Sequence, residues 1–283
     1  MALAMFSWGI AWSNAKVVNE YFSYSNLVFL RYLSSFLFLF IIFSIRRKTI
    51  QWPRFKTFIN ITIVSFLYYI YNIFFFLGTD VGEAGMGGVF VTTTNPIITF
   101  TIISMIDKVI HKKQIIGICI GALGGCIILN LFELGFSSMF IGENLYFLIC
   151  SITWGIITVV MTYGQKDYDS ISYIILCYMI TAIISSCFIV PSEIFDYSKY
   201  DFRFFINFFF VSIGAMCFGT SVYMYAAPRI GPIETSVFIF TVPFIAMGTA
   251  YIILDEPLKL EVIVGGLLGI LAVYLVNSKP SRT

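Results

Sequence analysis

Long, nearly uninterrupted apolar segments dominate this chain, and each is about as long as a helix that crosses a bilayer. Of the 283 residues 59% are hydrophobic and 11% are charged, and the charges gather in short groups between the apolar segments. The segments do not alternate with a period of two, which excludes a membrane β-barrel. We therefore predict an all-α membrane protein with ten transmembrane helices, near residues 2–18, 25–45, 57–77, 84–106, 114–131, 144–164, 171–190, 204–226, 232–254 and 260–277.

Several classes of protein are excluded by what lies between these helices. The connecting loops are too short for a soluble catalytic domain, and 17 Lys and Arg against 15 Asp and Glu leave no basic face for nucleic acid. All six cysteines fall inside apolar segments and His111 is the only histidine, so no metal site is expected. A nucleophile with a nearby base at membrane depth and an ATP-binding P-loop are also missing. We expect neither an enzyme nor a bound cofactor.

The distribution of positive charge predicts the orientation in the membrane. Twelve Lys and Arg fall in the even-numbered loops and the C-terminal tail, whereas three fall in the odd-numbered loops, which are richer in acids. Positively charged short loops stay on the cytoplasmic side. Both termini are therefore expected in the cytoplasm, with residues 278–283 as a cytoplasmic tail and residues 132–143 as an external linker. An inner, cytoplasmic membrane is the expected location.

The chain repeats itself weakly at offsets of 146 to 149 residues, about half its length. Each repeat, 1–131 and 144–277, holds five predicted helices. Because five is an odd number, the second repeat must enter the membrane in the opposite direction, as in many secondary transporters. The corresponding pairs, in chain order, are Trp8-Gly9 with Trp154-Gly155, Gly82 with Gly231, Thr94-Asn95-Pro96 with Thr241-Val242-Pro243, and Gly117-x-x-x-Gly121 with Gly265-x-x-x-Gly269.

Several motifs in this order are similar to those of one known family. They are the opening run from Trp8 to Lys16, Arg31-Tyr32-Leu33 in the second helix, Ala226-Ala227-Pro228-Arg229-Ile230-Gly231, Pro243, Asp255-Glu256-Pro257-Leu258, and the glycines 265 and 269. Over nearly its whole length the chain resembles the EamA-type members of the drug/metabolite transporter superfamily. It departs from their pattern at Asp107, where the family usually has Glu. The resemblance implies ten helices, a central cavity, and export or uptake of small metabolites.

Aromatic and amide side chains on the helices that this family packs around its cavity are the candidates for substrate binding. Rings and amides bind an organic molecule by stacking and a few hydrogen bonds, without a strong fixed charge. The alternative for each ring is an ordinary place in the core or in an interfacial belt, because 18% of the residues are aromatic. The candidates are Trp8, Trp12, Asn14, Lys16, Tyr71, Asn72, Asn95, Trp154 and Tyr223.

Charged residues within the predicted helices are few, and each has a structural alternative. Arg31 is most simply explained by snorkelling to the outer membrane surface or by pairing with an external acid. Lys16 is balanced between snorkelling and a place in the cavity, and both cations are candidates for binding an organic anion. Glu234 lies in the first turn of its helix, where it caps the helix dipole or couples transport to protons or cations.

Proline and glycine predict bends and close packing. Pro96 and Pro243 occupy corresponding positions in the fourth and ninth helices, where each removes a backbone hydrogen bond. They are candidates for a gate, or for static kinks. The two Gly-x-x-x-Gly motifs are assigned to helix packing or to a dimer contact.

The sequence thus favours a secondary transporter that moves a small uncharged or zwitterionic metabolite, such as an amino-acid-like solute, by alternating access. Two alternatives stay open: an organic-anion exchanger that uses Lys16 and Arg31, and a membrane scaffold or lipid-handling protein that transports nothing. The expected partners are the small-molecule substrate and the lipid bilayer, and the expected assembly is a monomer or a homodimer.

Overall fold

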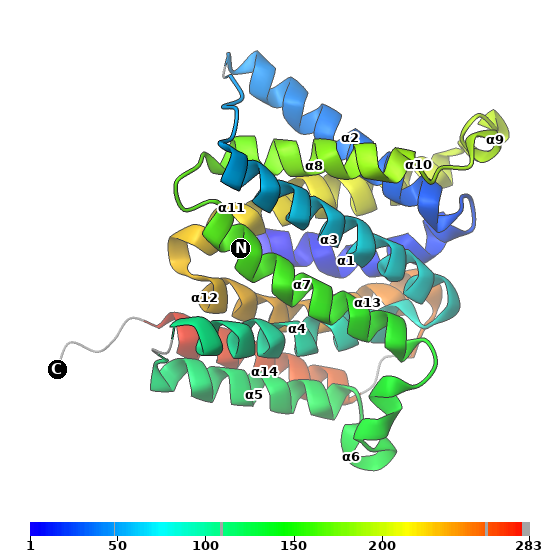
Figure 1. The fold of residues 1–283 in the computed structure, drawn as a ribbon. Coiled ribbons are helices and arrows are strands. Elements are labelled where there is room, and N and C mark those ends of the chain that lie inside the picture. Colours follow the sequence, from blue (N-terminus) through cyan, green and yellow to red (C-terminus); the bar gives the residue numbers. More distant parts are fainter. Residues whose placement is uncertain (48, 108–109, 258–259, 279–283) are drawn as a thin grey trace.

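The first half of the chain forms five long helices in the computed structural model. Residues 1–47, 49–107, 110–257 and 260–278 are described, and within them the chain is helical and has no strand (Figure 1). The five helices are α1 (Ala2–Asn19), α2 (Tyr24–Ile45), α3 (Phe55–Val81), α4 (Ala84–Asp107) and α5 (Lys112–Ile128).

Short helices join the two halves, and the second half is more irregular. The connection contains α6 (Leu131–Leu134) and the 3₁₀-helix η1 (Phe136–Phe140). Then follow α7 (Asn144–Gly164), α8 (Ser170–Ser186), the short α9 (Pro191–Ile194) and η2 (Tyr197–Lys199), α10 (Phe202–Phe209), η3 (Phe210–Thr220), α11 (Ser221–Ile230), α12 (Pro232–Val237), η4 (Phe238–Thr241), α13 (Val242–Leu254) and α14 (Leu260–Asn277).

The predicted helices correspond to these elements, but the eighth and ninth are not single α-helices. The eighth comprises α10, the π-helix η3 and α11, and the ninth comprises α12, the 3₁₀-helix η4 and α13. Pro243 explains the second irregularity, because it lacks the N–H that would continue the α-helical pattern back into η4. Pro96, its counterpart, lies within an uninterrupted α4. The predicted pair of kinks is therefore not symmetric.

Seven helical segments within the described residues are long and apolar enough to cross a membrane. They are α2, α3, α4, α7, Phe202–Ile230, Pro232–Leu254 and α14, and α8 is a shorter apolar helix. The protein is thus a multi-pass membrane protein, and the count of ten crossings stays a prediction. The part of the predicted cytoplasmic tail after residue 278 lies outside the described residues. So do five of the Lys and Arg residues counted above for the orientation, and Leu258 of the family motif. The six residues are Lys48, Lys108, Lys259, Lys279, Arg282 and Leu258.

Contacts between the halves follow a reciprocal pattern. In chain order α1 to α5 correspond to α7, α8, α10–α11, α12–α13 and α14. Helix α3 packs against α7, and α1 packs against η3. Helix α4 packs against α7, and α1 against α13. The pairs α2 with α8, α4 with α13 and α5 with α14 connect corresponding elements directly. Each of these contacts recurs when the two halves are exchanged.

Close packing of α5 against α14 uses Gly265, which the sequence singled out, and Gly124, which it did not. A Cβ atom on Gly265 would lie 2.5 Å from the carbonyl oxygen of Gly124, and one on Gly124 would lie 2.8 Å from the carbonyl oxygen of Gly265. Only glycine allows two helix backbones to approach this closely. The Gly-x-x-x-Gly helices therefore pack on each other within the chain.

Candidate substrate-binding cavity

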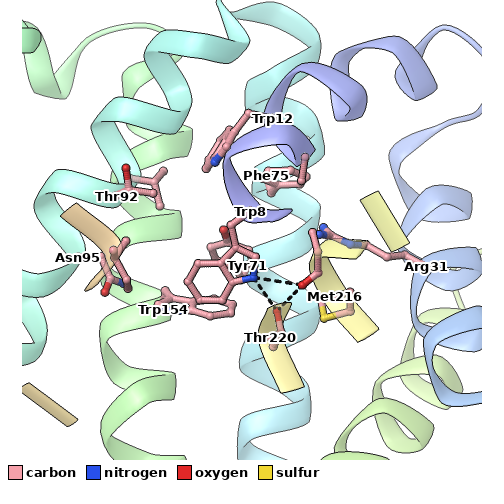
Figure 2. A pocket seen from close by; sticks show the side chains of 14 residues that line it. Trp8, Trp12, Arg31, Tyr71, Phe75, Thr92, Asn95, Trp154, Met216 and Thr220 are labelled. Atoms are coloured by element: carbon pink, nitrogen blue, oxygen red, sulfur yellow. Dashed lines mark hydrogen bonds between the residues drawn. The ribbon is translucent and has the colours of Figure 1, made fainter. Parts of the chain in front are cut away.

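A small cavity lies at the centre of the bundle, between the two halves (Figure 2). Its volume is about 40 Å³, room for roughly three water molecules. Six of the predicted helices contribute to its wall, namely the first, third, fourth, sixth, eighth and ninth, and α2 contributes as well. The lining residues are Trp8, Ala11, Trp12, Arg31, Tyr71, Phe75, Val91, Thr92, Asn95, Trp154, Ala215, Met216, Thr220 and Ile239.

Aromatic rings from both halves form much of this wall. Trp8 and Trp154, which correspond in the repeat, meet edge to face with ring centroids 5.0 Å apart. Tyr71 lies 4.8 Å from Trp154, and Trp12 lies 4.8 Å from Phe75. Such arrangements stabilise the rings by about 0.5–1.5 kcal/mol per pair beyond burial. The cavity therefore has a preformed wall of flat apolar surfaces.

The π-helix η3 fixes the indole of Trp8. The Nε1 atom donates to the carbonyl oxygen of Ala215 at 3.1 Å and to Oγ1 of Thr220 at 3.3 Å (Figure 2). Thr220 also donates to the Ala215 carbonyl, at 3.2 Å. A π-helical turn is typical of functional sites, because its altered spacing turns backbone groups toward a cavity. Here it supplies acceptors for a side chain from the other half of the chain.

Arg31 is buried at the cavity, with 4% of its surface exposed. The prediction that it snorkels to the membrane surface is wrong, because its side chain points inward (Figure 2). Nε donates to the carbonyl oxygen of Val211 at 3.1 Å and Nη1 to Oδ1 of Asn72 at 2.7 Å. The guanidinium also lies over the rings of Phe75 and Phe76, at 5.0 and 5.7 Å. Within the described residues no carboxylate pairs with it.

Asn72 lies behind Arg31 and is not among the residues that line the cavity. Its Oδ1 accepts from Arg31, while its Nδ2 donates to the hydroxyl of Tyr32 at 2.7 Å and to the carbonyl oxygen of Tyr68 at 2.8 Å. The side chain is fully buried. The structure thus places it as a support for Arg31 and not as a part of the wall.

Two polar atoms in the wall are buried without a hydrogen-bond partner in the described part of the chain. They are Oδ1 of Asn95 and Nε1 of Trp154. The Nδ2 atom of Asn95 has a partner, the carbonyl oxygen of Ser151 at 3.4 Å. A buried polar group without a partner costs about 1–3 kcal/mol, and native proteins avoid it except where a ligand or water completes the bond.

Three other candidates lie away from the cavity lining. Tyr223 is fully buried, shares a 2.9 Å hydrogen bond with Thr158 and packs on Trp8 with ring centroids 5.0 Å apart. Asn14 donates to the carbonyl oxygen of Ile10 in its own helix, at 2.7 Å. Lys16 donates to the carbonyl oxygen of Gly82 at 2.6 Å. For Asn14 and Lys16 the expected place in the wall is thus corrected, since each is bound to backbone elsewhere.

The candidates for gating and coupling are also placed. Pro96 is buried within α4, one residue after Asn95, and Pro243 is the second residue of α13. Glu234 lies in the first turn of α12 and accepts from Nε2 of Gln114 at 2.7 Å. It does not line the cavity and, in the described part of the chain, makes no side-chain hydrogen bond to the backbone at the start of α12. Its place in the first turn suits the positive end of the helix dipole, and its role in proton or cation coupling stays a prediction.

The sequence reasoning missed several wall residues, notably Phe75, Thr92, Met216 and Thr220. Phe75 follows Tyr71 by four residues and Thr92 precedes Asn95 by three, spacings that share a helix face. That signal was available in the sequence. Met216 and Thr220 reach the cavity from the π-helix, whose register the sequence does not reveal. Among the described residues no group of His, Cys, Asp and Glu could hold a metal ion.

The fold and the cavity define a multi-pass helical membrane protein with a central cavity lined by both halves. The model of the EamA-like transporter family matches residues 1–130 and 141–278, so the chain belongs to this family. A solved structure described only as "Crystal structure of protein" is similar, with a TM-score of 0.72 and 13% sequence identity over 97% of this chain and 95% of that one. No curated protein matches the chain.

Proposed function

We propose that this protein is a secondary transporter that carries a small organic solute across the cytoplasmic membrane by alternating access. The observation that carries the proposal is the central cavity, whose wall combines Trp8 and Trp154 from corresponding positions of the two halves. A site on the boundary between two repeats is exposed to either side when one repeat rocks against the other. Membership of a transporter family supports the same reading.

We further propose that residues 1–131 and 144–277 are inverted repeats, with both termini in the cytoplasm. The reciprocal contacts between the halves support this relation, because exchange of the halves leaves the contact pattern unchanged. In Figure 1, α1 runs from left to right, whereas α7, which opens the second half, runs from right to left. Opposite entry directions are what an inverted repeat requires.

The size of the cavity suggests how transport proceeds. About 40 Å³ is too little for a metabolite, so the solute requires the wall to open. In the proposal the described arrangement is a closed one, and α4 and the broken ninth helix move as gates near Pro96 and Pro243. The 3₁₀ turn before Pro243 has fewer α-helical hydrogen bonds to break, which favours the ninth helix as the more easily deformed gate.

The side chains that line the cavity limit which chemical classes of solute can bind there. Flat rings and the amide of Asn95 suit an organic molecule with an apolar body, and the buried Arg31 favours one with a negative group. A zwitterion, or an organic anion as in the exchanger alternative, fits better than an uncharged solute. Lys16 adds nothing to this charge, because it is bound to the Gly82 carbonyl.

A transport assay tests this function directly. The purified protein is reconstituted into sealed vesicles, and uptake is measured for a panel of labelled amino acids, carboxylates and uncharged metabolites. Uptake or counterflow above that of protein-free vesicles is expected for at least one solute. Trp12→Ala, in the wall, should reduce the rate at least tenfold. Trp52→Ala is the matched control, because Trp52 lies in a loop with 81% of its surface exposed. If no solute moves, the scaffold or lipid-handling alternative replaces the proposal.

A further inference from the structure

Resting on the proposed transport function, we propose that the solute is an amino-carboxylate. Its carboxylate binds the guanidinium of Arg31, and an N–H at its other end donates to Oδ1 of Asn95, with the apolar body between the rings of Trp8, Tyr71 and Trp154. The proposal therefore specifies a carboxylate at one end of the ligand, an N–H group at the other end and an apolar body between them.

The first argument is the unbalanced charge of Arg31. The residue lies seven positions after the start of α2, or about 10 Å along the helix axis at the usual rise. An arginine at such a depth is costly unless it is paired, and charged residues at membrane depth mark the pathways of substrates and ions. The ion pair between Arg203 and Glu20 joins two exposed side chains that do not line the cavity, and no carboxylate among the described residues pairs with Arg31. A carboxylate from the solute supplies the missing counter-charge.

The second argument is the hydrogen bonding of the guanidinium. Nε donates to the carbonyl oxygen of Val211 and Nη1 donates to Oδ1 of Asn72, and both acceptors are uncharged. No bond from Nη2 is found in the described part of the chain. These two bonds hold the planar fork in one orientation at the cavity wall (Figure 2). A fixed fork with free donors matches the two oxygens of a carboxylate.

The third argument comes from the opposite side of the cavity. Figure 2 shows Arg31 and Asn95 on opposite sides of the ring cluster formed by Trp8, Tyr71 and Trp154. The buried Oδ1 of Asn95 lacks a donor among the described residues, and an acceptor of this kind selects an N–H or O–H of the ligand. Indole faces nearby also attract a cationic group. An ammonium satisfies both requirements, which a second carboxylate does not.

The same geometry argues against other ligands. A phosphate ester with two charges calls for several converging cations, whereas among the described residues Arg31 is the one cation that lines the cavity. An amine without a carboxylate would add a second positive charge beside Arg31.

Ligand binding is best measured on the Trp52→Phe protein, in which Trp8, Trp12 and Trp154, all in the wall, are the remaining tryptophans. The probes are leucine and phenylalanine, their carboxamides, and their analogues without the amino group, 4-methylpentanoate and 3-phenylpropanoate. Quenching or shift of tryptophan fluorescence gives each affinity. At least one amino acid should bind at least tenfold more tightly than its amide and than its analogue without the amino group.

Variants then assign each end of the ligand. Arg31→Gln should remove the preference for acid over amide, and Asn95→Leu should remove the preference for the amino group. Asn72→Asp is the sharpest test, because it places a carboxylate beside Nη1 without removing Arg31. The new carboxylate accepts from Nη1 of Arg31 and from the Tyr32 hydroxyl, but the Tyr68 carbonyl loses the donor that Nδ2 of Asn72 supplies. In the protein that folds, acid binding should weaken at least tenfold. Arg203→Gln, at the exposed ion pair, is the matched control and should change neither preference.

The outcomes separate this inference from the proposed function. Equal affinity for acid and amide, full acid binding in a folded Asn72→Asp protein, or no binding of any probe would each overturn the inference. If vesicles transport solutes that carry no carboxylate, transport stands and the inference fails. If amino acids bind as described but are not moved across vesicles, the assignment of the ligand stands and the transport proposal fails.

Discussion

Glu256 lies between α13 and α14 and connects the second half to the start of α4 in the first half, and its removal should measurably destabilise the protein. Its Oε1 accepts from the backbone N–H of Ala84 and its Oε2 from that of Gly85, each at 3.0 Å. These N–H groups open α4, where the helix dipole is positive. Ala84 and Gly85 are buried, so water cannot easily replace the carboxylate.

The expected magnitude follows from counting the groups left without a partner. Glu256→Ala orphans two buried N–H groups, at about 1–3 kcal/mol each, and partial access of water reduces the total to roughly 2–4 kcal/mol. Glu256→Gln keeps one acceptor and loses the charge, which costs about 0.5–2 kcal/mol. The expected order of stability is therefore wild type, then Gln, then Ala.

Thermal unfolding in detergent, followed by the fraction of protein that stays monodisperse on size-exclusion chromatography, resolves this order. Glu83→Gln is the matched control, because Glu83 also lies at the start of α4 but is exposed and makes no side-chain hydrogen bond in the described part of the chain. Its midpoint should stay within error of wild type. Equal midpoints for Glu256→Ala and Glu83→Gln would refute the link between the halves.

Three further outcomes are expected. Gly265→Leu should reduce the yield of folded protein by several-fold, because any Cβ there meets the Gly124 carbonyl at 2.5 Å; unchanged chromatographic yield would contradict the packing of α5 on α14. The pKa of Glu193 is lowered chiefly by the backbone N–H of Ser23, so its stabilising effect exists above the ordinary glutamate pKa of about 4.3 and is lost as pH falls through the lowered value. Glu193→Gln should therefore unfold earlier than wild type at pH 7 but not in strong acid, in thermal scans across pH. A reporter that is active only in the cytoplasm should give signal when fused to the C-terminus; an expressed but silent fusion would reverse the proposed orientation.

The sequence predicted the class of fold because hydrophobic length is nearly sufficient for it in a membrane protein. It also identified Trp8, Trp12, Tyr71, Asn95 and Trp154 of the wall, because the family resemblance implied a central cavity between these helices and because rings and amides suit an organic solute. The proposed boundaries of the two repeats and the orientation are predictions that stay untested. What hydropathy could not give is the rotation of each helix about its own axis.

That missing rotation explains the residues that were misplaced. Arg31 and Lys16 look alike in the sequence as single cations in apolar helices, yet Arg31 faces the cavity and Lys16 binds the Gly82 carbonyl. Asn14 and Asn95 are both amides, but Asn14 is satisfied by the Ile10 carbonyl of its own helix. Whether a side chain donates to a backbone carbonyl of its own helix depends on its rotamer, which sequence patterns do not encode.

The repeat also explains why a nearly symmetric fold has an asymmetric site. Trp8 and Trp154 occupy corresponding positions and meet at the cavity. The position that corresponds to Arg31, about 147 residues later, is Tyr178, whose hydroxyl donates to the carbonyl oxygen of Met216 at 2.7 Å. The rings are thus shared by both halves, while the cation comes from the first half alone. In the proposed mechanism the repeat supplies two corresponding gates, α4 and the broken ninth helix, and the loss of symmetry at Arg31 makes the solute bind in one orientation. The two gates then meet different ends of the same molecule, so opening toward the two sides need not cost the same free energy.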